Sequence, residues 1–493
     1  MKKILIAVFS LTALGSNAQK IANPAPFAKT ITPAELKQHL AIVAGADMEG
    51  RETATEGQRK AAAYIEGQFK ALGLEPGNHG NYQLPYDVFQ DSLTGAALEV
   101  NGHSFEMDKD FNATVANISG TLRFSEVVVI GANAMDSLKN MNLAGRLVLI
   151  NTPVPQGRGQ GGGLYGALLN KGVTAVLSVA NNYPHTMIAS RKSPMATSTF
   201  RRTVTPLIFT ISESVARAIT GDYNTKTNTS SVKTFNANVL LEVKKSVIPL
   251  QSTDVIAYLP GTDLKDEYLF VTAHYDHLGK RGDSVIYYGA DDDGSGTVSV
   301  LEIAQAFVKA KAAGKGPRRT VVFMTVSGEE KGLWGSDYYS AHPVFPLDKT
   351  TADLNIDMIG RTDSSRRQGD SSNYVYVVGD DKLSSDLRPI SEGVNKKQLK
   401  MELDYKFNDP NDNQRIYYRS DHYNFAKRGV PIIFYYDGML GADYHRPTDT
   451  PDKINYPLLA KRAQLVFYTA WEMANRNDML KRDIPLDTNV FNR

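Results

Sequence analysis

Apolar runs that alternate with amphipathic stretches constrain the fold of this chain most, and they begin near Val255. The runs cover residues 268–273 (YLFVTA), 320–326 (TVVFMTV) and 430–435 (VPIIFY), and apolar residues recur at helical spacing over 301–308. Strands that are apolar throughout are typical of mostly parallel sheets buried on both faces. We therefore predict an α/β domain with a mostly parallel or mixed sheet and helices on both faces. Ligands of such sheets bind beyond the carboxyl ends of the strands.

The length of 493 residues exceeds what a single core usually supports, which predicts more than one folded unit. From about residue 112 to 235, short β-rich runs alternate with glycine-rich loops. We expect the main domain to comprise residues 19–115 and 246–493, with a small β-rich domain inserted at 116–245.

The first eighteen residues are typical of a secretory signal peptide. Lys2 and Lys3 precede an apolar run at 4–14, and small residues at 16–18 form a cleavage site. The run is shorter than the roughly 20 residues that a membrane crossing needs. We expect cleavage near Ala18 and export to a periplasm or to the medium, with no stable membrane insertion.

Composition limits the partners and the metal ligands that can be expected. The net charge is only +2, so nucleic acid is not an expected partner. The chain has no cysteine, so a transition-metal site would have to use histidine, aspartate and glutamate.

Acidic and imidazole side chains follow the apolar runs. They occur in 274–279 (HYDHLG), 289–296 (GADDDGSG), 327–330 (SGEE), 354–360 (LNIDMIG) and 444–450 (YHRPTDT). Gathered carboxylates raise each other's pKa unless a cation neutralises them. The pattern therefore predicts a divalent metal pair at one edge of the sheet, suited to clamping a water and a carbonyl group.

Two features refine this metal hypothesis. Asp357 lies inside an apolar run, and a buried aspartate must be paired or bound to metal. The neighbouring Glu329 and Glu330 point in different directions in a loop, so one can bind metal while the other accepts a proton from water.

These motifs resemble the secreted di-zinc aminopeptidases of peptidase family M28, over most of residues 32–115 and 250–475. The resemblance implies a fold shared with zinc carboxypeptidases and two Zn²⁺ ions per chain. It makes His274 of the H-x-D motif a metal ligand, oriented by Asp276. It also makes Asp292, in the G-A-x-D-D-x-S-G motif, the carboxylate that bridges the two ions.

The same resemblance implies roles for the remaining site residues. Each zinc ion would take a further pair of ligands, and the pairs are His274 with Asp357 and Glu330 with His445. Glu329 would be the general base, and Tyr444 would hydrogen-bond the developing oxyanion. The insertion, with its run at 144–153 (AGRLVLINTP), resembles a protease-associated (PA) domain.

The expected function is an aminopeptidase acting on peptides with a free N-terminus. A carboxypeptidase or dipeptidase remains open, because Arg361, Arg415 and Arg419 near the motifs could hold a substrate carboxylate. A glutaminyl cyclase with a single zinc and a receptor-like module without activity are further alternatives. His277 and His422 are interpreted as supporting or structural residues.

Overall fold

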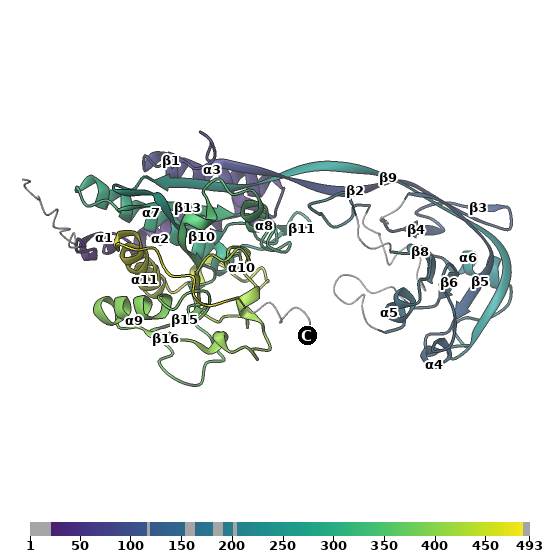
Figure 1. Ribbon diagram of the computed structural model, residues 1–493. Helices are drawn as coiled ribbons and strands as arrows, with labels where there is room; N and C mark the ends of the chain where they lie inside the picture. Colours follow the sequence, from purple (N-terminus) through teal and green to yellow (C-terminus); the bar gives the residue numbers. More distant parts are fainter. Residues whose placement is uncertain (1–20, 116–118, 153–162, 181–190, 201–204, 487–493) are drawn as a thin grey trace, which may run out of the picture. The chain divides into compact units, whose positions relative to one another are not determined.

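The computed structural model describes residues 21–486 except 116–118, 153–162, 181–190 and 201–204 (Figure 1). The expected signal peptide lies outside these described residues. The chain divides into two compact units, Met1–Tyr86 with Ser252–Arg493 and Asp87–Gln251. The second unit is longer at both ends than the insertion expected from composition, because the long strands β2 (Gln83–Val100) and β9 (Val232–Leu259) belong partly to each unit.

The first unit contains most of the α-helices in the described residues. Its strands, besides the end of β9, are β1 (Glu75–Pro76), β10 (Leu264–His274), β11 (Lys280–Arg281), β12 (Val285–Ile286), β13 (Arg319–Val326), β14 (Thr350–Ile356), β15 (Tyr374–Val378), β16 (Glu402–Asp404) and β17 (Ile432–Tyr436). Its α-helices are α1 (Ala25–Ala28), α2 (Pro33–Val43), α3 (Glu56–Ala71), α7 (Gly296–Ala312), α8 (Trp334–Ala341), α9 (Leu387–Gln398), α10 (His422–Lys427) and α11 (Tyr456–Asn475). Single turns are η1 (Ala46–Arg51), η3 (Ala290–Ser295, a π-helix), η4 (Leu347–Lys349), η5 (Lys406–Asn408), η6 (Ile416–Tyr418) and η7 (Pro451–Lys453).

The sheet of this unit has the strand order β16-β15-β17-β14-β10-β13-β9. The four central strands β17, β14, β10 and β13 are parallel to one another. Strand β15 runs antiparallel to β17, and β9 runs antiparallel to β13. The prediction of a mixed, mostly parallel sheet is therefore confirmed.

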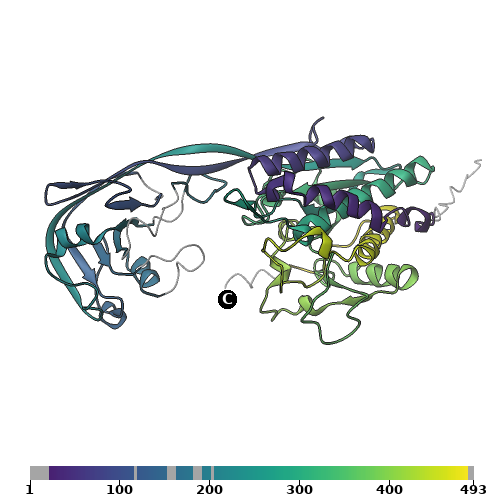
Figure 2. The same cartoon turned by 180° about the vertical axis from the view of Figure 1, so that it is seen from behind.

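Both faces of this sheet are covered by helices, as predicted. Alternate side chains of β10 point to opposite faces, so Val271 packs with residues of α2, α7 and α11 while Phe270 packs with α8 and α10. In Figure 2 the purple N-terminal helices lie in front of the strands on the first of these faces. Because both faces are buried, strands β13 and β17 are mostly apolar. Strand β14 is an exception, because its buried Asp353 and Asn355 accept hydrogen bonds from the hydroxyl of Thr272 in β10.

The second unit has its own core. Besides parts of β2 and β9 it contains β3 (His103–Phe105), β4 (Phe111–Ala113), β5 (Gly120–Ile130), β6 (Leu147–Ile150), β7 (Ala175–Val179), β8 (Leu207–Ile211), α4 (Met135–Leu138), α5 (Gly163–Asn170) and α6 (Glu213–Thr220). Strands β5 to β8 are parallel, and their two faces bury separate apolar clusters. Its identity as a PA domain stays a prediction. None of the helices in the described part of the chain is long and apolar enough to cross a membrane.

Candidate metal centre

The predicted metal ligands come from segments that follow the strands of the first unit. His274 is the last residue of β10, Asp357 comes directly after β14, and Glu330 comes shortly after β13. Asp292 lies in η3 at the start of α7, and His445 lies in the loop after β17. The structure brings all five together because parallel strands end at one edge of the sheet.

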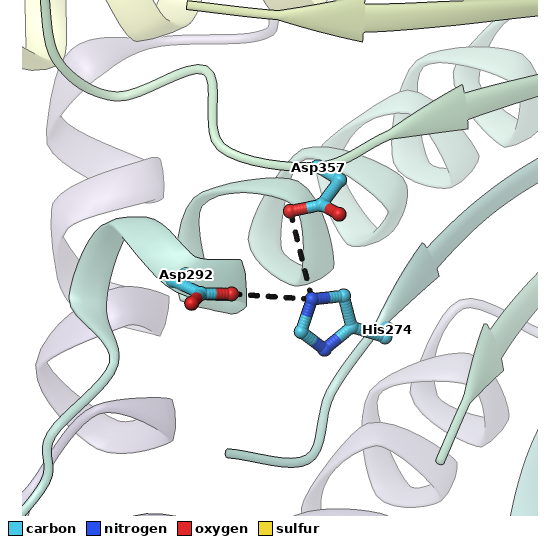
Figure 3. A group of neighbouring side chains, drawn as sticks. All are labelled: His274, Asp292 and Asp357. Atoms are coloured by element: carbon cyan, nitrogen blue, oxygen red, sulfur yellow. Dashed lines mark ion pairs between the residues drawn. The ribbon is translucent and has the colours of Figure 1, made fainter. Parts of the chain in front are cut away.

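The first group consists of His274, Asp292 and Asp357 (Figure 3). Nε2 of His274 lies 3.3 Å from Oδ1 of Asp292 and 3.5 Å from Oδ1 of Asp357. The three potential ligand atoms lie within 4.8 Å of one another. One imidazole nitrogen and two carboxylate oxygens at this spacing suit a zinc ion with an open coordination position.

The second group contains Glu330 and two histidines. Nε2 of His445 lies 3.1 Å from Oε2 of Glu330 and 3.2 Å from Oδ2 of Asp292. Nδ1 of His277 lies 2.7 Å from the other oxygen of Glu330, Oε1, and His277 also meets the spacing of a ligand. The candidate ligand group at this position consists of His277, Asp292 and Glu330. His445 lies closer to Oδ2 of Asp292 than His277 does, at 3.2 Å against 3.9 Å. The assignment of His445 as the ligand and of His277 as a supporting residue stays a prediction.

Asp292 joins the two groups because its oxygens face different partners. Oδ1 faces His274 of the first group, and Oδ2 faces His445 of the second. The Oδ2 atom of Asp449 accepts hydrogen bonds from the backbone N–H of Asp292 and of Asp291. The peptide bond between Asp292 and Asp293 is cis. Asp449 was not among the residues predicted from sequence, although it lies in the acidic and imidazole-containing stretch 444–450.

Asp276 supports the site differently from the expected pairing with His274. Nδ1 of His274 lies closer to the backbone carbonyl oxygen of Asp276, at 3.1 Å, than to its carboxylate Oδ1, at 3.6 Å. That carboxylate instead accepts hydrogen bonds from the backbone N–H of Glu329 and from the hydroxyl of Thr53. Asp276 therefore positions the loop of Glu329 as well as the imidazole ring of His274.

Arg51 is a supporting residue that the sequence analysis missed. Its buried guanidinium donates hydrogen bonds to the carbonyl oxygens of Tyr275, Tyr288 and Gly289, and more weakly to that of Val43. It thereby ties the loop after His274 to the loop before Asp292. In the sequence, Arg51 is distinguished only by its acidic neighbours Glu49 and Glu52. Such a cluster of charged residues is ordinarily solvated, so it gave no reason to predict a buried arginine.

The electrostatics of the site follow from buried carboxylates that lie close to two imidazole rings. Burial, with Glu330 and Asp357 nearby, raises the pKa of Glu329 well above its usual range. Burial opposes ionisation of Asp292, but the nearby imidazoles of His274 and His445 outweigh it and hold the pKa of Asp292 well below its usual range. Burial lowers the pKa of His445, but the carboxylates of Asp292 and Glu330 outweigh this effect and raise the pKa to about 10. The carboxylates thus favour positive charge at both groups.

The donor atoms fit zinc. Nε2 of His274 and Oδ2 of Asp292 are buried and have no hydrogen-bond partner among the described residues. A buried polar atom without a partner is costly, and a metal ion would satisfy both. Imidazole nitrogen and carboxylate oxygen are ligands that zinc accepts.

Tyr444 lies beside this centre, as expected. Its ring stacks on that of His445 with 3.8 Å between the centroids. It lines a small cavity together with Asp292, Glu329 and Asp357. Burial raises the pKa of Tyr444 far above its usual value, so its hydroxyl keeps the proton and can donate a hydrogen bond.

His422 is a structural residue, and it makes stability depend on pH. It is fully buried, its Nε2–H donates to the carbonyl of Tyr417 at 2.8 Å, and its ring stacks on Phe434. Burial lowers the pKa of His422 to about 3. In the unfolded chain the pKa is about 6.5, so the unfolded state binds an extra proton between these values and stability falls as the pH drops below 6.5.

This single group is expected to reduce the free energy of unfolding by up to about 1.4 kcal/mol per pH unit below pH 6. Urea unfolding of the wild type and of His422→Gln between pH 5 and 7 measures it. The variant should show the shallower pH dependence, and parallel curves would contradict the assignment.

Comparison with known proteins identifies this part of the chain. Residues 254–470 match the model of peptidase family M28. This match covers less than half of the chain. The resemblance to family M28 inferred from the motifs is confirmed over these residues, and all five predicted ligands lie inside them.

Curated relatives of this part of the chain align with it over only part of their own length. A probable leucine aminopeptidase of Arthroderma otae is 31% identical over 226 residues, which are 45% of this chain and 57% of that protein. A probable zinc metalloprotease of Leptosphaeria maculans is 23% identical over 281 residues, 49% of this chain and 62% of that protein. The chain thus spans less than two thirds of these relatives.

Solved structures share the fold. The aminopeptidase from Aneurinibacillus sp. strain AM-1 aligns with a TM-score of 0.54 and 18% identity, covering 94% of this chain and 99% of that one. BSAP, a zinc aminopeptidase from Bacillus subtilis, aligns with a TM-score of 0.53 and 18% identity, covering 92% and 99%. At this identity the likeness shows the fold alone.

Proposed function

We propose that the protein is a zinc-dependent aminopeptidase that holds two ions and removes N-terminal residues from peptides. The observation that carries the proposal is the arrangement around Asp292, whose two oxygens face two separate ligand groups. The names of the relatives support hydrolysis at the amino end. The charged start of the chain and the apolar run behind it support export, with cleavage near Ala18.

The proposed mechanism assigns one task to each side chain. Zinc, when bound, would polarise the scissile carbonyl and acidify the attacking water. Glu329 would accept the proton of that water and then donate it to the leaving amine. Oε2 of Glu329 lies 3.9 Å from Nε2 of His274, next to the first group. The hydroxyl of Tyr444 would donate a hydrogen bond to the oxyanion.

The alternatives differ in what they require of the site. A glutaminyl cyclase would use one zinc, whereas the structure gathers two ligand groups. The gathering of two groups of candidate ligands supports an active enzyme over a receptor-like module without activity. A carboxypeptidase would need to bind the substrate's free carboxylate close to the reacting carbonyl, with the amine left unrecognised.

A hydrolysis panel tests the proposal. Leucyl p-nitroanilide and dipeptides should be cleaved, N-acetylated dipeptides should resist, and a chelator should abolish cleavage until zinc is restored. Cleavage of substrates with a blocked amine, together with no cleavage of substrates with a blocked carboxylate, would overturn the aminopeptidase hypothesis in favour of a carboxypeptidase.

A further inference from the structure

One arginine projects into the cavity beside the metal centre. The cavity has an acidic side with Asp292, Glu329 and Asp357, and its other lining residues include Tyr444 and Arg419. The remaining walls are apolar or aromatic, from Met358, Ile416, Phe434, Tyr436 and Leu440. Among the described residues that line it, Arg419 alone carries a positive side chain.

The three arginines near the motifs differ in what they contact. Arg361 forms an ion pair of 3.0 Å with Asp443. Arg415 lies over the ring of Tyr418 at 5.2 Å and does not line the cavity. Arg419 is exposed, and no carboxylate in the described part of the chain lies within ion-pair distance of it. Arg419 is therefore the cation that remains available to a ligand in the cavity.

The hydrogen bond that Arg419 makes leaves most of its donors available. Its Nη2 donates to the hydroxyl oxygen of Tyr444 at 3.1 Å. A guanidinium has five N–H donors in a planar fork that matches a carboxylate. The bond to Tyr444 fixes where this fork stands relative to the reacting carbonyl.

The distances restrict which carboxylate can reach Arg419. Under the proposed function, the hydroxyl of Tyr444 touches the oxyanion, and Arg419 lies one hydrogen bond farther away. One residue of extended chain spans at most about 3.6 Å. A carboxylate this near the carbonyl belongs to one of the two residues that flank the scissile bond, and only the residue that follows the bond can supply a C-terminal carboxylate.

We propose that Arg419 binds a substrate carboxylate on the residue that follows the scissile bond, so that the enzyme prefers dipeptides or peptides with an acidic second residue. The shared ligand is a carboxylate, supplied either by the free C-terminus of a dipeptide or by an aspartate side chain. The inference rests on the proposed function and deepens it.

Two substrate pairs separate these sources. The first is a leucyl dipeptide with its C-terminal carboxylate free or amidated, and the second is a leucyl tripeptide amide with aspartate or asparagine in second place. Wild-type kcat/KM should favour the carboxylate member of at least one pair by about tenfold or more, because hydrogen bonds to charged groups are the strong ones. Arg419→Gln should bring that ratio close to one, and Arg419→Lys should retain part of it.

The controls distinguish a direct contact from an effect through Tyr444. Arg415→Gln should leave the ratios unchanged, since Arg415 does not line the cavity. Tyr444→Phe should slow both members of a pair alike. Calorimetric Kd values of the free and amidated dipeptides, measured on the Glu329→Gln variant, provide a readout independent of turnover. The free dipeptide should bind more tightly than the amidated one to Glu329→Gln, and this difference should disappear in the double variant Glu329→Gln/Arg419→Gln.

Two results would overturn the inference while sparing the aminopeptidase proposal. One is a wild-type enzyme that cleaves both members of each pair equally well. The other is an Arg419→Gln variant that slows both members equally and keeps the ratio. By contrast, failure to cleave any of these substrates or leucyl p-nitroanilide would overturn the proposed function itself.

Discussion

Glu329→Gln is expected to lower kcat by on the order of 10³-fold while zinc content stays at the wild-type level. Glutamine has nearly the same shape but cannot accept a proton at neutral pH. The structure keeps Glu329 outside both ligand groups, since Asp292 and Asp357 approach His274 more closely than Glu329 does. Steady-state kinetics and elemental analysis of the same preparation measure both quantities.

Glu330→Gln is the matched comparison for this variant. Glu330 contacts both His277 and His445, so its loss should reduce zinc content together with activity. Full turnover by Glu329→Gln, or equal zinc loss in both variants, would contradict the division of roles between these neighbours.

Asp292→Asn is expected to release both zinc ions and to abolish activity, the largest effect on metal binding of any single substitution. The carboxylate faces both groups, and a neutral amide removes the negative charge that offsets two cations. Losing an outer-shell partner already costs about 10–100-fold in metal affinity, so loss of a bridging ligand should exceed that. Zinc per chain after dialysis at defined free zinc measures the effect.

Asp283→Asn is the surface control for Asp292→Asn, because Asp283 is exposed and lies outside both ligand groups. His445→Ala should release only the ion of the second group, and His277→Ala should weaken that ion less. A variant Asp292→Asn that retains one tightly bound ion would show that Asp292 does not bridge.

Much of the fold could be predicted because the pattern of burial is local information. Strands β10, β13 and β17 are buried on both faces, and their runs of apolar residues record this directly. The bounds of the second unit could not be predicted in this way. The strands β2 and β9 continue through the change of unit with no change in composition at Asp87 or Gln251.

The clustering of the candidate ligands was predictable for a related reason. His274, Glu330 and Asp357 follow apolar runs, and the ends of parallel strands meet at one edge of the sheet. The roles of Asp292 and His445 came instead from the resemblance to a known family. Both His277 and His445 lie near Glu330, and they differ in their distance from Asp292, at 3.9 Å and 3.2 Å.

Local patterns in the sequence therefore predicted the sheet, its helices and the cluster of candidate ligands, because burial and strand ends are visible in the residue types of short segments. Tertiary structure alone revealed the contacts between distant segments. Arg51 reaches the carbonyls of Tyr275 and Gly289 across more than two hundred residues. Likewise, only the packed cavity distinguishes Arg419 from Arg415, because a side chain's access to a site depends on neighbours that are remote in sequence.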